Sequence, residues 1–373
     1  MGHPIVRTLS WMMTLGALLV LGAWCFGRWW SDELEWSQYL FWVPSPAVLM
    51  GAAVLLLVSS GLARKARGLA GADSLGSRPP AARARRLAWG LWVGVLAWVC
   101  VAEYHVQRYL PRVGTNPGGA AVRFMYWNPS QTEYLADHVG AVGPAVLVVA
   151  NAPGTVNWGA VRGAMSVEGG ATYAVRYERF TVVSRYPVLR WAGTGLGIQG
   201  AKARAFIWRG GGYVVQDEGQ AVFVELDTRG ALGRTTVVWA LDLPSDFNLS
   251  RWVVMRQGAK RLAEFEGPAF ERAGDGMDRP VSLEHGFPSP DVIVGDFNTP
   301  RGSASLSEIV GSMANAFDQA GRGISATYPR EWPVVAIDQA FVGPDLRARK
   351  YDVLDLQEGQ HRAVVFDVAE REP

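Results

Sequence analysis

The stretch "DVIVGDFNTP" (Asp291–Pro300) says more about the fold than any other ten residues of the chain. Its short apolar run is bounded by turn-forming residues, which is typical of a strand buried on both faces. The strand ends abruptly on Asp296 and Asn298, an acid and an amide. Polar residues at such a strand end serve either in a turn or in a site, and this stretch alone leaves both interpretations open.

Short apolar runs of the same kind continue on both sides of this stretch. Nine further runs, separated by Gly, Asp and Pro, are strand candidates: 122–127, 145–150, 179–184, 203–208, 213–216, 221–226, 235–241, 338–342 and 363–368. Helical spacing and capping residues predict two helices, Trp252–Glu266 and Ser303–Asn315. Many strands with few helices predict one α/β domain of packed sheets over 119–373, after a Gly- and Pro-rich linker at 105–118.

Two glycine-rich segments in this region do not indicate a nucleotide site. The segment 209–213, "RGGGY", has strand candidates on both sides and is predicted to be a hairpin turn. The segment 193–200, "GTGLGIQG", does not follow a strand and open a helix, as a dinucleotide-binding loop would. We expect both to be loops.

Polar side chains gather at the ends of the predicted strands. Each alone has a structural interpretation as a turn residue, but their number and order favour a common rim. Oxygen donors of this type suit Mg²⁺ or Mn²⁺, and one imidazole accompanies them. The candidates are Asn128, Asn151, Asp242, Asp296, Asn298, Asp338 and His361.

Five motifs in this order resemble the endonuclease/exonuclease/phosphatase superfamily, which includes DNase I-like nucleases, apurinic endonucleases, sphingomyelinases and inositol polyphosphate phosphatases. The resemblance covers about 122–368, and its motifs are "VRFMYWN" (122–128), "VVSRYPV" (182–188), "DVIVGDFNTP", "AIDQAFVGP" (336–344) and "GQHRAVVFDV" (359–368). It implies a four-layer α/β sandwich with two central, mostly antiparallel sheets. It also implies a metal-dependent phosphoric ester hydrolase that uses Mg²⁺ or Mn²⁺.

The resemblance also implies roles for individual residues. Asn151 and Asp296 would bind the metal, and Asn128 would help to bind either the metal or the scissile phosphate. Asp296 would orient or deprotonate the attacking water, and Asn298 would hold the phosphate. Asp338 would support His361, which would stabilise or protonate the phosphoryl group.

Three positions depart from the family pattern. Asn151 stands where the family has its main metal-binding Glu, Leu241 where it has a His, and Gln360 where it has the Asp of an Asp-His pair. A neutral amide is a weaker ligand than a carboxylate, so metal binding is expected to be weakened. Asp242 and Gln360 are candidate compensating residues, and the sequence leaves the same role open for Glu133, Asp137 and Glu178.

The first 104 residues have the composition of a membrane anchor. Three uncharged apolar runs lie at Leu9–Phe26, Tyr39–Ala63 and Leu87–Ala102. About 20 apolar residues span the hydrocarbon core, so we expect spanning helices at 9–27, 39–63 and 87–104. Pro44 and Pro46 are expected to delay the start of the second helix. Interfacial tryptophans support these spans: Trp29, Trp30, Trp36, Trp42, Trp89 and Trp92.

The loop charges predict an orientation. The 64–86 loop contains seven Lys or Arg and one acid, whereas the 28–38 loop contains three acids. The positive-inside rule places the N-terminus and 64–86 in the cytoplasm and the C-terminal domain outside it. A cleaved signal peptide is disfavoured, because the first run lacks a small-x-small cleavage pattern followed by soluble sequence.

Charge and cysteine content exclude several classes of site. Residues 105–373 contain 27 basic and 29 acidic residues, which is not the basic footprint of a nucleic-acid binder. Cys25 and Cys100, the only cysteines, lie in apolar runs, so the C-terminal domain has neither a disulfide framework nor a cysteine zinc site.

Three hypotheses of function follow. The first is a membrane-anchored, extracytoplasmic, metal-dependent phosphoesterase that hydrolyses a phosphodiester or phosphomonoester. The second is a catalytically impaired relative, a pseudoenzyme that binds or senses a phosphate-bearing ligand. In the third, the chain works through its helices, but the apolar runs contain no ionisable acid or base that would line a transport pathway.

Overall fold

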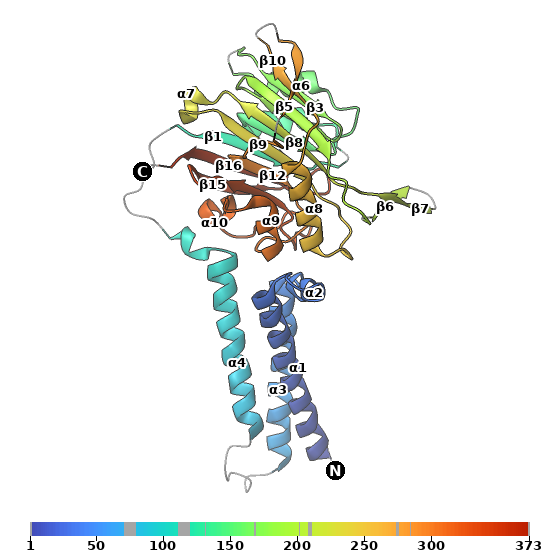
Figure 1. Cartoon of the computed structure of the whole chain (residues 1–373). Helices are drawn as coiled ribbons and strands as arrows, with labels where there is room; N and C mark the ends of the chain where they lie inside the picture. The colour runs from blue at the N-terminus through green and yellow to red at the C-terminus, as the bar shows by residue number, and fades with distance from the viewer. Residues whose placement is uncertain are drawn as a thin grey trace. The chain divides into compact units, whose positions relative to one another are not determined.

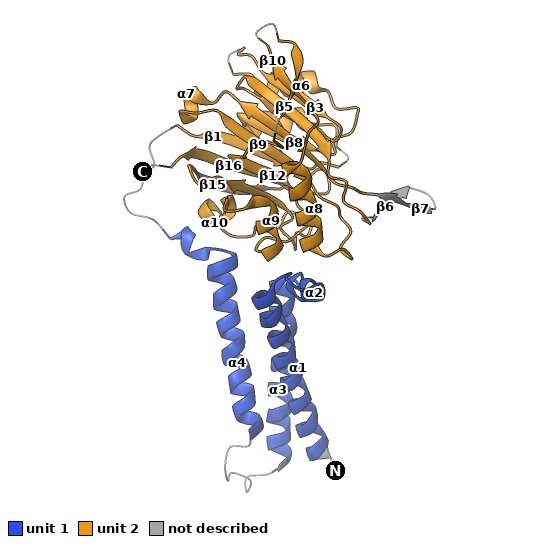
Figure 2. Cartoon of the chain, viewed as in Figure 1, with its two compact units in different colours: residues 1–110 blue, residues 111–373 orange. Residues whose placement is uncertain are grey.

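The computed structural model (Figure 1) describes residues 2–70, 80–110, 120–130, 132–167, 169–200, 202–207, 211–273, 276–283 and 285–371. The chain divides into two compact units, residues 1–110 and 111–373 (Figure 2). Parts of three predicted segments lie outside the described residues: 111–118 of the linker, 71–79 of the basic loop, and 208–210 at the expected hairpin turn.

The first unit is helical. Its elements are α1 (Gly2–Trp30), α2 (Ser37–Phe41), α3 (Ser45–Ala70), α4 (Pro80–Trp98), a π-helical turn η2 (Val99–Glu103) and a 3₁₀ turn η3 (Val106–Tyr109). Three segments are long and apolar enough to cross a membrane: Pro4–Trp30, Ser45–Leu69 and Pro80–Glu103. The expected run from 39 is broken, because α2 ends before Pro44 and α3 begins at Ser45, which puts Pro46 in its first turn.

Polar contacts join the helices of this unit. The Ser59 hydroxyl lies 3.1 Å from that of Ser10 and 2.7 Å from that of Thr14, linking α3 to α1. Arg28 pairs with Glu103 at 3.0 Å, and the Ser45 hydroxyl donates to the same carboxylate. Small hydroxyl side chains are common between membrane helices, because they allow close approach and satisfy one another.

The second unit is built on two mixed sheets. The six-stranded sheet has the order β15-β16-β1-β2-β4-β3, and the eight-stranded sheet has the order β11-β10-β5-β8-β9-β12-β14-β13. Pairing is antiparallel except for β1 with β2 and β9 with β12. The first sheet contains β1 (Val122–Trp127), β2 (Val146–Ala150), β3 (Tyr173–Tyr177), β4 (Phe180–Ser184), β15 (Leu346–Leu354) and β16 (Ala363–Glu370). The second contains β5 (Val188–Gly195), β8 (Gln220–Leu226), β9 (Thr236–Asp242), β10 (Pro268–Arg272), β11 (Asp278–Ser282), β12 (Val292–Asp296), β13 (Ala314–Asn315) and β14 (Asp338–Val342).

The side-chain alternation of the strands creates three apolar layers. In β2, Val146 and Val148 face the second sheet, whereas Leu147 and Val149 face outward. The outer face of the first sheet is covered by α5 (Leu135–Val142) and α6 (Trp158–Met165). The outer face of the second sheet is covered by α8 (Arg251–Ala263), the 3₁₀ turn η4 (Ala304–Leu306) and α9 (Ser307–Val310). Helix, sheet, sheet and helix form four layers, so the predicted α/β sandwich is confirmed (Figure 1).

Most predicted elements are present with small shifts of their ends. Each of the ten strand candidates coincides with a strand, and the first predicted helix is α8. The second was wrong, because Ser303–Asn315 divides into η4, α9 and β13, and Gly311 with φ +58° ends α9. The segment 193–200 was only partly a loop, since β5 extends to Gly195. Lys202–Ile207 (β6) and Gly211–Gln216 (β7) pair as a separate two-stranded sheet. Two short helices, α7 (Arg229–Leu232) and α10 (Ala316–Ala320), complete the unit.

Gly295 is required by the close approach of β12 to β9. A Cβ atom at this position would lie 2.1 Å from the Leu241 carbonyl oxygen, so the backbone would have to move. We expect Gly295→Ala to lower the free energy of unfolding by about 2 kcal/mol or more, because overpacking against a buried backbone is not relieved by side-chain rotation.

Thermal unfolding of the full chain in detergent, followed by near-ultraviolet circular dichroism, measures this effect. Gly163→Ala in α6 is the matched control, since no atom lies within 4 Å of its added Cβ and alanine favours a helix. Equal melting temperatures for the two variants would contradict the packing described for β9 and β12.

Candidate active site

Three aspartates of the second sheet lie side by side at one edge. Asp242 ends β9, Asp296 ends β12 and Asp338 begins β14. The register pairs Asp296 with Asp242 on one side and with Asp338 on the other. All three are buried. Neighbouring like charges in a sheet are destabilising, so this edge requires compensating positive charge.

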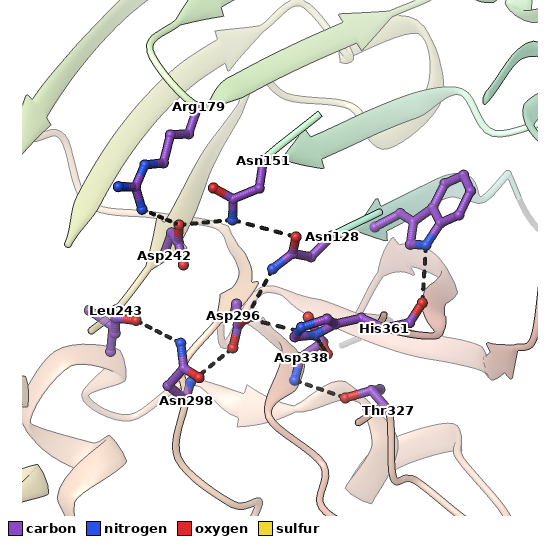
Figure 3. A network of polar contacts seen from close by, with 11 residues as sticks. Asn128, Asn151, Arg179, Asp242, Leu243, Asp296, Asn298, Thr327, Asp338 and His361 are labelled. Atoms are coloured by element: carbon purple, nitrogen blue, oxygen red, sulfur yellow. Dashed lines mark hydrogen bonds and ion pairs between the residues drawn. The ribbon is translucent and has the colours of Figure 1, made fainter. Parts of the chain in front are cut away.

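The edge of the first sheet supplies two amides. Asn128 and Asn151 follow the parallel neighbours β1 and β2, so both lie at the carboxyl ends of their strands. The Asn128 amide donates to Asp296 Oδ2 at 3.0 Å, and the Asn151 amide donates to Asp242 Oδ2 at 3.1 Å. The amide of Asn151 also lies 3.4 Å from Asn128 Oδ1. Figure 3 shows the resulting chain of contacts between the two sheets.

His361 lies against the aspartates. It precedes β16, and its Nδ1 is 2.9 Å from Asp338 Oδ2 and 3.7 Å from Asp296 Oδ2 (Figure 3). Its ring packs against that of Tyr328 with 4.9 Å between centroids, and its carbonyl accepts from the Trp127 indole. Its Nε2 has no hydrogen-bond partner in the part of the chain that the structure describes. This nitrogen is therefore available to a ligand.

Asn298 makes hydrogen bonds to the ends of both β9 and β12. Its backbone N–H donates to Asp296 Oδ1 at 3.1 Å, and its amide donates to the Leu243 carbonyl at 2.7 Å. Its φ of +46° lies in the left-handed region, which asparagine tolerates better than most residues. One of its two amide hydrogens is thus engaged within the protein, which leaves the other for a ligand.

Arg251, at the start of α8, joins the loop that follows β9 to the loop that contains Asn298. The side chain is fully buried, and Nη1 donates to the Pro244 carbonyl at 2.9 Å and to the Asn298 carbonyl at 3.4 Å. Its Nη2 donates to the Asp246 carbonyl. Sequence reasoning missed this residue, because a single arginine at a helix start gives no sign that it turns inward.

Sequence reasoning also missed Arg179 and Asp217. The guanidinium of Arg179 is 3.6 Å from both Asp242 Oδ2 and Asp217 Oδ1. The backbone N–H of Asn151 donates to the Arg179 carbonyl at 2.9 Å, which extends the pairing of β2 with β4 by one residue. The sequence did contain a feature that could have identified Arg179. Antiparallel pairing of the predicted strands 145–150 and 179–184 would have placed it beside Asn151.

Burial and charge change the protonation of the site. Burial and the neighbouring Asp338 carboxylate raise the pKa of Asp296 to about 8, and burial raises the pKa of Asp242 to about 6. Burial alone would lower the pKa of His361, but the charges of Asp338 and Asp296 outweigh it and raise this pKa to about 9. The carboxylates therefore resist ionisation, which is the behaviour of a buried acidic group without sufficient positive charge.

The donor set fits a divalent cation. Asp296, Asp338 and His361 offer ligand atoms within 4.8 Å of one another, and Asp338 Oδ1 is buried without a hydrogen-bond partner among the described residues. Carboxylate and amide oxygens are the ligands that Mg²⁺ and Mn²⁺ prefer. His361 Nδ1 already faces Asp338 Oδ2 at 2.9 Å, and the neighbouring carboxylates raise the pKa of the ring to about 9, so the oxygens fit a cation better than the imidazole does.

The remaining candidates lie outside this network. Gln360 is exposed, and its backbone carbonyl accepts from the Arg330 N–H. Glu133 accepts from Thr155, Glu178 accepts from Gln220, and Asp137 is exposed on α5. Of the proposed compensating residues, only Asp242 lies in the network.

Comparisons with known proteins give matches to solved structures alone. No protein-family model matches the chain, and no curated protein sequence matches it. The matches include an endonuclease/exonuclease/phosphatase from Beutenbergia cavernae, with 16% identity over 67% of this chain and 72% of that one and a TM-score of 0.45. They also include a mannosyl-6-phosphatase from Bacteroides thetaiotaomicron, with 12% identity over 66% and 99% of the two chains and a TM-score of 0.45. A third is the 2',3'-cyclic phosphatase ANGEL2, with 9% identity over 68% and 99% and a TM-score of 0.41.

The first of these proteins bears the name of the family that the sequence motifs resemble. None of these three matches exceeds 16% identity or a TM-score of 0.45. The chemistry proposed for this chain therefore depends on its own residues.

The bracing role of Arg251 is testable. We expect Arg251→Met to lower the free energy of unfolding by on the order of 3 kcal/mol, because buried carbonyls of the site loops lose their donor. Urea denaturation of the full chain measures the change. Arg256→Met on the same helix is the control, since its side chain is 67% exposed, pairs at the surface with Glu308 and lies over the Trp252 ring, away from the site loops. A loss no greater than that of the control would show that the loops hold their shape without Arg251.

Proposed function

We propose that this chain is a membrane-anchored, divalent-metal-dependent phosphoesterase. The observation that carries the proposal is the row of three buried aspartates, which meets an imidazole and two amides at one edge. A fold that only needed to be stable would not gather these charges, because each buried carboxylate opposes the ionisation of the next. A cation would bind the carboxylate oxygens, and an anionic phosphate would accept hydrogen bonds from the N–H groups that remain.

The metal would be held by oxygens from both sheets. Asp296, Asn128 and Asn151 are the expected ligands, and Asp242 supplies the carboxylate that Asn151 lacks. The 3.1 Å hydrogen bond between Asn151 and Asp242 supports this substitution, because it places the aspartate where the amide points. When bound, the cation would neutralise charge on the phosphoryl oxygens.

The protein side chains would perform the proton chemistry. Asp296 would orient the attacking water and accept its proton in the ionised form, which a bound cation and the neighbouring His361 favour. The protonated His361, with Nε2 available, would donate a hydrogen bond to the phosphoryl or leaving-group oxygen. Asp338 would hold this imidazolium through Nδ1 at 2.9 Å, which fixes the ring orientation.

One observation favours the second candidate function, a binding module that does not hydrolyse its ligand. Three positions where the family carries titratable side chains hold Asn151, Leu241 and Gln360, and Gln360 is exposed. The site would then still bind a phosphate through the donors of His361 and Asn298. With Asn151 in place of a carboxylate, it would hold the metal too weakly to activate that phosphate. Hydrolysis separates the two candidates.

The membrane location is part of the same proposal. The three apolar segments would anchor the chain in a bilayer, and the basic 64–86 loop would lie in the cytoplasm. The second unit would then lie outside the cytoplasm, where a phosphate-bearing substrate would reach it. Its near-neutral charge disfavours nucleic acid as that substrate.

Turnover tests the proposal. The full chain in detergent should hydrolyse p-nitrophenyl phosphate or bis-p-nitrophenyl phosphate with Mg²⁺ or Mn²⁺, and a chelator should abolish the reaction. Asp296→Asn and His361→Gln should each lower kcat by about 100-fold or more, because each removes a group needed at the reacting phosphate.

Asp227→Asn is the control for this assay, since that half-buried carboxylate pairs with nearby Arg229. Hydrolysis that survives both site substitutions would place the reaction elsewhere. Absence of hydrolysis in the parent chain, together with metal-dependent binding of inorganic phosphate, would favour the binding module instead.

The compensating role of Asp242 makes a separate prediction. Asp242→Asn should weaken Mn²⁺ binding by about 10- to 100-fold, because the cation loses the carboxylate to which Asn151 donates. Isothermal titration calorimetry with Mn²⁺ measures the affinity. Glu225→Gln is the control, since that carboxylate pairs with Arg190 away from the site. Unchanged affinity in Asp242→Asn would exclude this residue as a ligand.

A further inference from the structure

Arg179 is the one cation of the polar network to which the proposed mechanism gives no task. It precedes β4, opposite Asn151, and its side chain extends toward Asp242 (Figure 3). It lies between β3 and β4 of the first sheet. Of the two carboxylates beside it, Asp242 ends β9 of the second sheet, and Asp217 lies in the segment that precedes β8. It therefore lies where the two sheet edges meet.

The geometry of Arg179 leaves its donors unused. Charge-assisted hydrogen bonds from arginine to carboxylate are about 2.7–2.9 Å long. The two distances of Arg179 are both 3.6 Å, and its guanidinium makes no hydrogen bond to any part of the chain that the structure describes. Its side chain is 45% exposed, so a ligand that enters from solvent can reach it. Five N–H groups in a planar fork are thus available beside the candidate metal ligands.

A purely structural role explains this arrangement poorly. An arginine that served only to neutralise Asp217 and Asp242 would gain most from close, paired hydrogen bonds, and loose half-exposed pairs contribute little to stability. The two carboxylates attract the guanidinium from one side without saturating it. That is the arrangement expected of a group held in place for a third partner.

We propose that Arg179 binds the phosphate group of the substrate and makes the site selective for phosphomonoesters. This inference rests on the proposed phosphoesterase function and names its substrate class. A guanidinium fork matches two terminal oxygens of a phosphate. A monoester offers three such oxygens and close to two negative charges at neutral pH, so it keeps oxygens for Arg179 after the cation and His361 are satisfied. A diester has only two terminal oxygens and one charge.

The test compares two ester classes with three variants of the full chain. Arg179→Met should raise KM for p-nitrophenyl phosphate by about 30-fold or more, and for bis-p-nitrophenyl phosphate by only about threefold, with smaller changes in kcat. Arg179→Lys should recover part of the loss, because it keeps the charge and loses the fork. Arg176→Met is the matched control: this arginine is exposed on β3 of the same hairpin, and both kinetic constants should stay unchanged.

A binding measurement separates this inference from hydrolysis. With Mg²⁺ present, inorganic phosphate should bind the parent chain, and Arg179→Met should weaken that binding by about 10- to 100-fold in isothermal titration calorimetry. If phosphate binding depends on Arg179 but neither ester is hydrolysed, the proposed hydrolysis fails and the phosphate-binding role stands.

Three results would overturn the inference. They are phosphate binding that is unchanged in Arg179→Met, an equal rise of KM for both ester classes, and the same loss in Arg176→Met. Unchanged phosphate binding would show that Arg179 does not contact the phosphate, and an equal rise of KM would show contact without selectivity. The same loss in Arg176→Met would show an effect that is not specific to Arg179. In each case hydrolysis by the parent chain would leave the proposed function intact.

Discussion

The burial of three neighbouring carboxylates is the constraint on which the rest of the site depends. The register of β9, β12 and β14 sets Asp242, Asp296 and Asp338 in a row, and two packed sheets exclude water from them. Their repulsion is relieved in part by amide hydrogen bonds and by the imidazole of His361. Burial is the largest cause of the raised pKa values of Asp296 and Asp242, and a cation at this edge would offset that cost of ionisation.

A neighbouring strand end supplies the charge that Asn151 lacks. Asn151, which lacks a charge, lies within hydrogen-bond distance of Asp242, which supplies one. Arg179, which lies opposite Asn151 just before β4, approaches the same aspartate, so a positive charge accompanies the relocated negative one. A chain can lose an ionisable side chain at one strand end and recover its charge at the end of a neighbouring strand, provided that both ends meet at one edge. Metal-dependent hydrolysis therefore remains compatible with Asn151.

The sequence predicted the strands that are buried on both faces and missed those with mixed surroundings. β2 and β12 were predictable, because β2 is apolar throughout and β12 is apolar or small up to Asp296. β15, "LRARKYDVL", alternates buried and exposed positions at a sheet edge and carries three basic residues, so it has no apolar run. α5 and α6 were missed because glycines interrupt their short apolar faces. In the site, strand-end residues were predictable, whereas Arg179, Asp217 and Arg251 depend on pairings between distant segments.

The most direct measurement is the location of Mn²⁺ by anomalous scattering in a crystal of the full chain. We expect one anomalous peak at the edge where the two sheets meet, about 2.1 Å from a carboxylate oxygen of Asp296 and of Asp242. Amide oxygens of Asn128 and Asn151 would complete the protein ligands. A peak elsewhere, or no peak at millimolar Mn²⁺ with both carboxylates well ordered, would contradict the claim that these buried aspartates form a metal site.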